Sequence, residues 1–101
     1  FARDVRAFVR QLPRGIITIE DGKQLVRSSG SVGANYIEAN ESLSKKDFAM
    51  RIKICRKEAK ESRYWLELFD TLPQPLVKER NRLMDEAMSF VKMFSSIVSK
   101  L

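Results

Sequence analysis

Hydrophobic residues recur every three or four positions along the chain, which is the spacing of an amphipathic α-helix. The first row consists of Phe1, Val5, Phe8 and Leu12. Pro13 and Gly15 follow this row and predict the end of its helix. The longest row consists of Phe48, Ile52, Cys55, Ala59, Ser62, Leu66 and Phe69, and the last row of Met84, Ala87, Val91, Phe94, Val98 and Leu101. These rows predict helices whose apolar sides pack together.

The residues between the rows predict where the third and fourth helices begin and end. Ser44 is suited to cap the third helix, and Asp47 places a negative charge in its first turn. We expect this helix to continue to Leu72, where Pro73 interrupts the pattern, and Pro75 suits the first turn of the fourth helix. With four helices joined by short connections, the sequence predicts an all-α, antiparallel up-down-up-down four-helix bundle.

The second predicted helix carries two adjacent rows at the same spacing. One row consists of Leu25, Ser29, Val32 and Tyr36, and the other of Val26, Gly30, Gly33 and Ile37. A Gly-x-x-Gly beside serines could also form a phosphate-binding loop, but such a loop normally lies where a helix begins. Because glycine costs a helix about 1 kcal/mol relative to alanine, we interpret Gly30 and Gly33 as sites of close approach by a neighbouring helix. A leucine at Gly33 is then expected to overpack that contact.

The composition restricts the chemistry that the chain can perform. A length of 101 residues suits one hydrophobic core, so we expect a single domain over residues 1–101. One cysteine and no histidine exclude an intramolecular disulfide, a Cys/His metal cluster and a Cys-His or Ser-His nucleophile pair. The cysteine, Cys55, lies in the apolar row of the third helix, which favours a buried apolar role over a reactive thiol. We therefore predict no enzyme activity, no cofactor, no metal and no small-molecule substrate.

The sequence also predicts where the protein resides. No apolar run reaches the roughly 20 residues that a membrane span needs, and the N-terminus lacks a signal-peptide pattern. Together with the single cysteine, these features predict a cytoplasmic protein with no membrane partner. Because the sequence begins at Phe1, without a methionine and inside a periodic pattern, we expect that a few native N-terminal residues are missing.

Basic residues outnumber acidic ones, with 19 Lys and Arg against 13 Asp and Glu and a net charge of +6. One basic row on the third helix consists of Lys53, Arg56, Lys60 and Arg63, and one on the first helix of Arg3, Arg6 and Arg10. Such rows can bind nucleic-acid phosphates, although a solvated helix often looks similar and Glu67 interrupts the longer row. Tyr64 is the aromatic residue best placed to stack on a base. Since such aromatic residues are few, we expect contacts to the backbone rather than sequence readout.

A second apolar stripe lies beside the core row of the third helix. It consists of Met50, Ile54, Trp65, Leu68 and Leu72. The two stripes make this helix apolar over more than half of its circumference, which exceeds what one intramolecular face usually needs. Either a wide bundle core or a second subunit can cover the stripe, and Trp and Met favour an interface. The predicted oligomer interface consists of Met50, Ile54, Trp65 and Leu68.

Asn35 and Glu38 lie one turn apart near the end of the second helix. Paired carboxylate chemistry is not expected there, because the sequence places no second acid or histidine beside them. We interpret both residues as structural, with hydrogen bonds or an ion pair that fix the turn into the third helix.

Two segments of the sequence resemble a known family. The stretch "RSSGSVGANYIEANESLSKKDF", followed by "KICRKEAKESRYWLELF", closely resembles the bacterial four-helix-bundle proteins encoded by intervening sequences in 23S ribosomal RNA genes. The matching positions are Arg27, Ser31, Val32, Asn35, Glu38, Ser44, Phe48 and the segment from Lys57 to Leu66. Ala39 and Asn40 stand where that family often has a glycine, a departure that concerns only the shape of the following turn.

The resemblance implies a non-enzymatic helical protein, often a ring-like homopentamer, whose cellular role is generally unassigned. The accessory variability determinant of diversity-generating retroelements is similar in fold and works with a reverse transcriptase and RNA through a basic surface. We therefore expect a non-catalytic homo-oligomer, a pentamer by the resemblance, that associates with RNA or a ribonucleoprotein. The alternative is a protein-interaction scaffold or adaptor without direct nucleic-acid binding, for which the basic rows would only support solubility.

Overall fold

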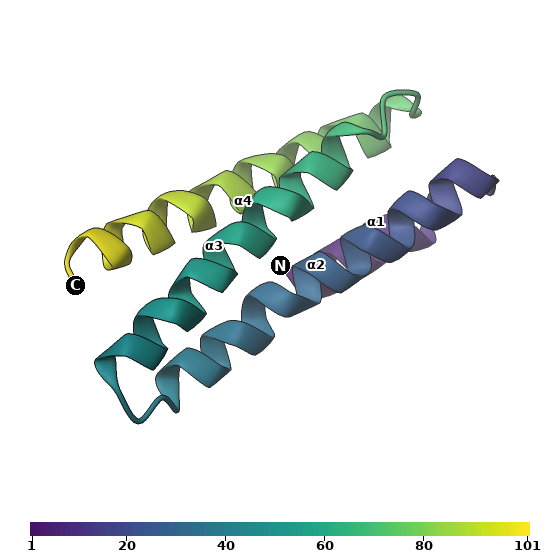
Figure 1. The fold of residues 1–101 in the computed structure, drawn as a ribbon. Coiled ribbons are helices and arrows are strands. Elements are labelled where there is room, and N and C mark those ends of the chain that lie inside the picture. The colour runs from purple at the N-terminus through teal and green to yellow at the C-terminus, as the bar shows by residue number, and fades with distance from the viewer.

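Four α-helices account for most of the chain in a computed structural model that describes residues 1–101 (Figure 1). They are α1 (Ala2–Arg10), α2 (Ile16–Asn40), α3 (Lys45–Glu67) and α4 (Gln74–Ser99). Successive helices are connected by short turns and run in opposite directions, which gives a rod of 45 × 20 × 18 Å. The predicted all-α four-helix bundle is confirmed.

The helix α1 is much shorter than the other three and fills only part of its corner of the bundle. Its backbone approaches those of α2 and α4 but not that of α3, so α1 lies diagonally across from α3. Along α2, the Val9 side chain lies over Gly22, and the Arg6 guanidinium lies over Gly30. Beyond the first residues of α1, a groove of about 450 Å³ lies between α2 and α4.

The buried side chains form two clusters along the rod. The cluster that includes α1 consists of Val5, Phe8, Leu25, Leu66, Phe69, Leu76 and Leu83. The cluster nearer the turn between α2 and α3 consists of Val32, Ala39, Ile52, Cys55, Ala59, Val91 and Phe94. The predicted core row of α3 is confirmed, since its members from Ile52 to Phe69 are buried. Burial raises the pKa of the Cys55 thiol, in agreement with a structural role for this residue.

Serine side chains allow α2 and α3 to approach each other between the two clusters. The Ser62 hydroxyl lies 3.0 Å from the Ser28 hydroxyl across the two helices, and both side chains are fully buried. Within its own helix, the Ser28 hydroxyl donates to the Leu25 carbonyl. The close contact between helices was predicted at the glycines of α2. It is instead formed by small serine side chains whose hydroxyl groups hydrogen-bond to each other.

The interpretation of Gly30 and Gly33 is correct in one respect and wrong in another. Both residues lie inside the continuous helix α2, which confirms that they form no loop. A Cβ atom at Gly33 would have no atom within 4 Å, and one at Gly30 would meet only the Arg6 guanidinium, at 3.7 Å. No neighbouring backbone approaches Gly33, because this position lies beyond the part of α2 that α1 covers. A larger side chain there is not expected to overpack a helix contact.

The start of α3 agrees with the sequence analysis, and its end does not. Ser44 is the N-cap, and its hydroxyl accepts a hydrogen bond from the Asp47 amide at 3.1 Å. The helix ends at Glu67 instead of continuing to Leu72. Beyond this end, Phe69 is still buried in the core, where its ring meets that of Phe8 edge-on.

Ion pairs connect helices that are far apart in the sequence. The Arg27 guanidinium of α2 bonds to the carboxylates of Glu58 at 3.3 Å and Glu61 at 3.0 Å on α3. Glu58 is a buried acid, so this pairing compensates a charge that would otherwise be costly.

A second group of ion pairs fixes α1 to α4. The Arg82 guanidinium of α4 bonds to Asp4 of α1 at 3.1 Å and to Glu79 of its own helix at 2.6 Å. The hydrogen bond from Arg82 lowers the pKa of the Glu79 carboxyl. Because this pKa is lowered in the folded state, the stabilisation is present above the unfolded-state pKa and is lost as the pH falls through the folded-state value.

Candidate nucleic-acid interface

The basic row of α3 lies on an outer face of the bundle. Lys53 and Lys60 are exposed, and Arg56 and Arg63 are half-buried. With about 100° between successive residues, this row falls on the side of α3 opposite Glu58 and Ser62, which bond to α2. The four side chains therefore follow one another along α3 on a face that α2 does not cover.

Three of these four cations have no acidic partner. Lys53, Arg56 and Lys60 make no ion pair and no side-chain hydrogen bond within the chain. Arg63 lies 3.9 Å from the Glu67 carboxylate, a weak contact between two exposed side chains of one helix. The interruption of the row by Glu67 is thus present in the structure but affects only its last member. An uncompensated row at one-turn spacing is suited to polyanions rather than to a single small anion.

Tyr64 is the aromatic side chain beside this row. It is 53% exposed and follows Lys60 by one helical turn. Its ring meets that of Trp65 edge-on, with 5.0 Å between the ring centroids. One exposed ring next to a line of cations can stack on one base, but it cannot read a sequence of bases.

The predicted basic row of α1 lies on a different side of the molecule. Arg3, Arg6 and Arg10 are all exposed, and the Arg6 guanidinium donates to the Ala2 carbonyl of its own helix. Since α1 and α3 are diagonally opposite corners of the bundle, the structure does not bring the two rows together. They are two separate basic faces.

The fold gathers three further cations beside Arg10 that were not predicted from the sequence. Arg14 precedes α2, while Lys23 and Arg27 lie one turn apart on α2, and all three border a pocket between α1 and α2. The spacing of four residues between Lys23 and Arg27 was a usable signal, because it places both on one side of a helix. Their proximity to Arg10 could not be seen, since it depends on the reversal of the chain at Pro13.

The Asn35 side chain forms hydrogen bonds of the structural kind that was predicted, whereas the Glu38 side chain forms none. The Asn35 side chain donates to the Ser31 carbonyl and accepts a hydrogen bond from Arg51 of α3 at 3.1 Å. The Glu38 carboxylate is exposed and forms no hydrogen bond or ion pair. The backbone carbonyl of Glu38 accepts from the Ser42 hydroxyl, so its contribution to the turn is made by the main chain.

The residues of the predicted oligomer interface differ in exposure. Met50 is 48% and Leu68 41% exposed, while Ile54 and Trp65 are half-buried. Trp65 also packs against the core cluster that includes α1. Part of the stripe thus belongs to the bundle, and the rest remains an apolar outer surface.

Neither a metal site nor a membrane span is found in the chain. No three His, Cys, Asp or Glu side chains gather closely enough to hold a metal ion. None of the helices combines the length and the apolar character that crossing a membrane requires.

The fold and these surfaces define an all-α four-helix-bundle protein with basic outer faces. The family model described as 23S rRNA-intervening sequence protein matches residues 1–96, and the chain belongs to this family. A crystal structure from Bacteroides thetaiotaomicron is similar, and it is described as a protein with unknown function from the S23 ribosomal protein family. The two share 30% sequence identity with a TM-score of 0.78, over 97% of this chain and 91% of that chain. No curated protein matches the chain.

Proposed function

We propose that this protein is a non-catalytic RNA-associated protein that binds the nucleic-acid backbone through the basic face of α3. The observation that carries the proposal is the uncompensated row of Lys53, Arg56 and Lys60 on one outer side of that helix. The membership in a family named for 23S rRNA intervening sequences favours RNA as the polyanion. A cytoplasmic location follows from such a partner.

The contacts of this face are with phosphates, and the sequence of the RNA matters little. Lysine and arginine side chains at one-turn spacing can follow a phosphate backbone, and Tyr64 can add a single stacking contact. The shorter row of α1 offers Arg3 and Arg6 as a second, smaller basic face on another side of the bundle.

A binding titration at two salt concentrations tests this proposal. The RNAs are a 23S ribosomal RNA fragment and an unrelated RNA of equal length. With three or four phosphates neutralised per chain, affinity should fall roughly 20- to 150-fold between about 50 and about 200 mM salt, to a similar extent for both RNAs. Binding that is absent at the lower salt concentration, or that does not change with salt, would contradict it.

We further propose that the protein is a homo-oligomer whose subunits meet through Met50, Ile54, Trp65 and Leu68. The exposed part of this apolar stripe supports the proposal, because buried Met and Trp side chains are favoured at the centres of interfaces. In a ring, the basic face of α3 would be repeated around the assembly and would bind RNA with higher avidity. The resemblance described above implies five copies.

Light scattering tests the assembly. The parent should have a multiple of the 11.7 kDa chain mass at micromolar concentration, and Met50→Glu with Leu68→Glu should lower that mass, since both changes place charges in the apolar contact. Lys53→Glu with Lys60→Glu is the matched control on the neighbouring face and should leave the mass unchanged. If the parent protein is a monomer, the proposal of a homo-oligomer is wrong.

The second candidate function is a protein-interaction adaptor without direct RNA binding. The same exposed stripe favours it, because an apolar outer surface can also be covered by a different protein. In that case the basic rows would be solvated surface, and the salt titration with RNA would show no binding.

A further inference from the structure

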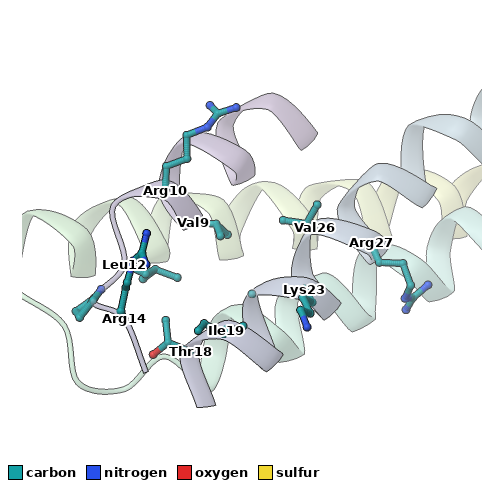
Figure 2. A pocket seen from close by; sticks show the side chains of 11 residues that line it. Val9, Arg10, Leu12, Arg14, Thr18, Ile19, Lys23, Val26 and Arg27 are labelled. Atoms are coloured by element: carbon teal, nitrogen blue, oxygen red, sulfur yellow. The ribbon is translucent and has the colours of Figure 1, made fainter. Parts of the chain in front are cut away.

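A pocket of about 670 Å³ lies where the chain turns from α1 into α2 (Figure 2). Its apolar lining comes from both helices and the turn between them, and includes Val9, Leu12, Ile19 and Val26. Gly22 is buried under the Val9 side chain, so the absence of a side chain there lets α1 pack closely against α2 at the base of the pocket. In Figure 2, Val9 and Val26 lie toward the middle of the view, and cationic side chains lie around them.

Every charged side chain that lines this pocket is basic. The four cations are Arg10, Arg14, Lys23 and Arg27. Arg27 is neutralised by its two partners on α3, and Lys23 has an exposed acidic neighbour, Glu20, at 3.5 Å. Arg10 and Arg14 have no ion pair and no side-chain hydrogen bond within the chain. The pocket therefore presents two uncompensated guanidinium groups beside an apolar surface, a combination that suits a ligand with both carboxylates and apolar groups.

Exposed isoleucines extend the apolar surface beyond the pocket. Ile16 is 80%, Ile17 73% and Ile19 49% exposed, and all three lie at the start of α2. With about 100° between successive residues, Ile16 and Ile19 share one side of α2, while Ile17 lies on the other side. An exposed apolar pair beside a pocket favours the docking of another molecule. Because Ile19 lines the basic pocket and Ile16 lies one turn before it, the ligand is expected to be larger than a single small anion.

The lining favours a peptide over a nucleotide. No aromatic side chain lines the pocket, and Thr18 is the only side chain there that carries a hydroxyl group. A base is normally held by stacking on an aromatic ring and by hydrogen bonds to its edge, and this pocket offers little of either. Aliphatic side chains of a peptide, in contrast, need only an apolar surface of matching shape.

We propose that this pocket binds an acidic amphipathic segment of a partner protein. Its aliphatic side chains cover Val9, Leu12 and Ile19, and its carboxylates bind Arg10 and Arg14. Charge disfavours a second copy of this chain as the occupant, because the chain has a net charge of +6 and several of its acids, Glu58, Glu61, Glu79 and Glu86, already pair with Arg27 or Arg82. The inference goes beyond the proposed function, since the pocket and the basic face of α3 lie on different helices.

Fluorescence anisotropy with a synthetic peptide tests this inference. The probe is a labelled amphipathic peptide with leucine at helical spacing and glutamate at the other positions. Arg10→Gln with Arg14→Gln should weaken its binding at least about tenfold, because two charge-assisted contacts are removed. Arg56→Gln with Lys60→Gln removes the same charge from α3 and should change the affinity less than about twofold. Both pairs are at the surface, so the folding of each variant should be nearly unaffected.

Two further probes identify the occupant. A peptide with serine in place of leucine and the same charge should bind at least about tenfold more weakly than the leucine peptide, because it cannot cover the apolar lining. Equal binding of the two peptides, or equal weakening by the two double variants, would mean unspecific attraction between charges and would overturn the proposal. The proposal would also be overturned if single-stranded RNA displaced the leucine peptide and if the changes at Arg10 and Arg14 weakened the binding of that RNA. The proposed function is tested independently of these peptides, because it depends on RNA binding by Arg56 and Lys60.

Discussion

Replacing Phe8 by alanine should lower the free energy of unfolding by about 3 to 5 kcal/mol. Phe8 is fully buried and is one of only two buried residues of α1. Its ring meets that of Phe69 at 5.9 Å between centroids, at the point where the chain leaves α3. The change therefore removes the main apolar contact that holds the short helix α1 against the rest of the bundle.

Urea unfolding of the parent and of Phe8→Ala measures this loss. Arg3→Ala is the matched control, because Arg3 is an exposed residue of the same helix, and it should change the stability by less than about 0.5 kcal/mol. A loss below about 1 kcal/mol for Phe8→Ala would mean that α1 contributes little to the fold. The account of α1 as the fourth element of the bundle would then be wrong.

Ser62→Leu should destabilise the protein by about 1 to 3 kcal/mol. Ser62 is fully buried where α2 and α3 approach each other, and its hydroxyl contacts that of Ser28. A leucine side chain at this position would push the two helices apart. The substitution tests whether the serines, rather than the glycines of α2, mark the close contact.

Ser89→Leu is the matched control for this prediction. Ser89 lies in α4, is exposed, and donates to the carbonyl four residues earlier, as Ser62 does in α3. Leucine has the higher helix propensity, so Ser89→Leu should be neutral or slightly stabilising. If both variants have the stability of the parent in thermal and urea unfolding, the contact between α2 and α3 has more space than the structure indicates.

Local patterns predicted those parts of the fold that depend on nearest neighbours along a helix. The core row of α3 could be identified because residues three and four apart share one side of a helix. The cap at Ser44 could be identified because the hydroxyl and the amide that it bonds are three residues apart. Each of these features is determined within one or two helical turns.

The end of α3 and the surroundings of Gly33 depend on distant parts of the chain and were not predicted correctly. Phe69 is buried as the helical row predicts, but it lies beyond the end of α3 and contacts Phe8, more than half of the chain away. Gly33 belongs to a row adjacent to the buried row of α2, and its surroundings depend on how far α1 reaches along α2. Spacing along one helix contains no information on either point.

The candidate sites divide in the same way. The basic row of α3 could be predicted because its members share one helix and one side of it. The pocket between α1 and α2 could not, because Arg10 and Lys23 meet only after the chain reverses at Pro13. The sequence also did not reveal which basic side chains form ion pairs, because the acidic partners of Arg27 lie more than 30 residues away.

The central claim is that the basic face of α3 binds RNA phosphates, and the most direct measurement compares the parent with Arg56→Gln/Lys60→Gln on the same RNA. Affinity is measured as a function of salt for both proteins. If each side chain neutralises one phosphate, the slope of log affinity against log salt should become shallower by about 1.4 to 1.8 in the double variant. Thermal stability should remain nearly unchanged, because these charges make no ion pair in the fold. Equal affinities and equal slopes for the two proteins would contradict the claim.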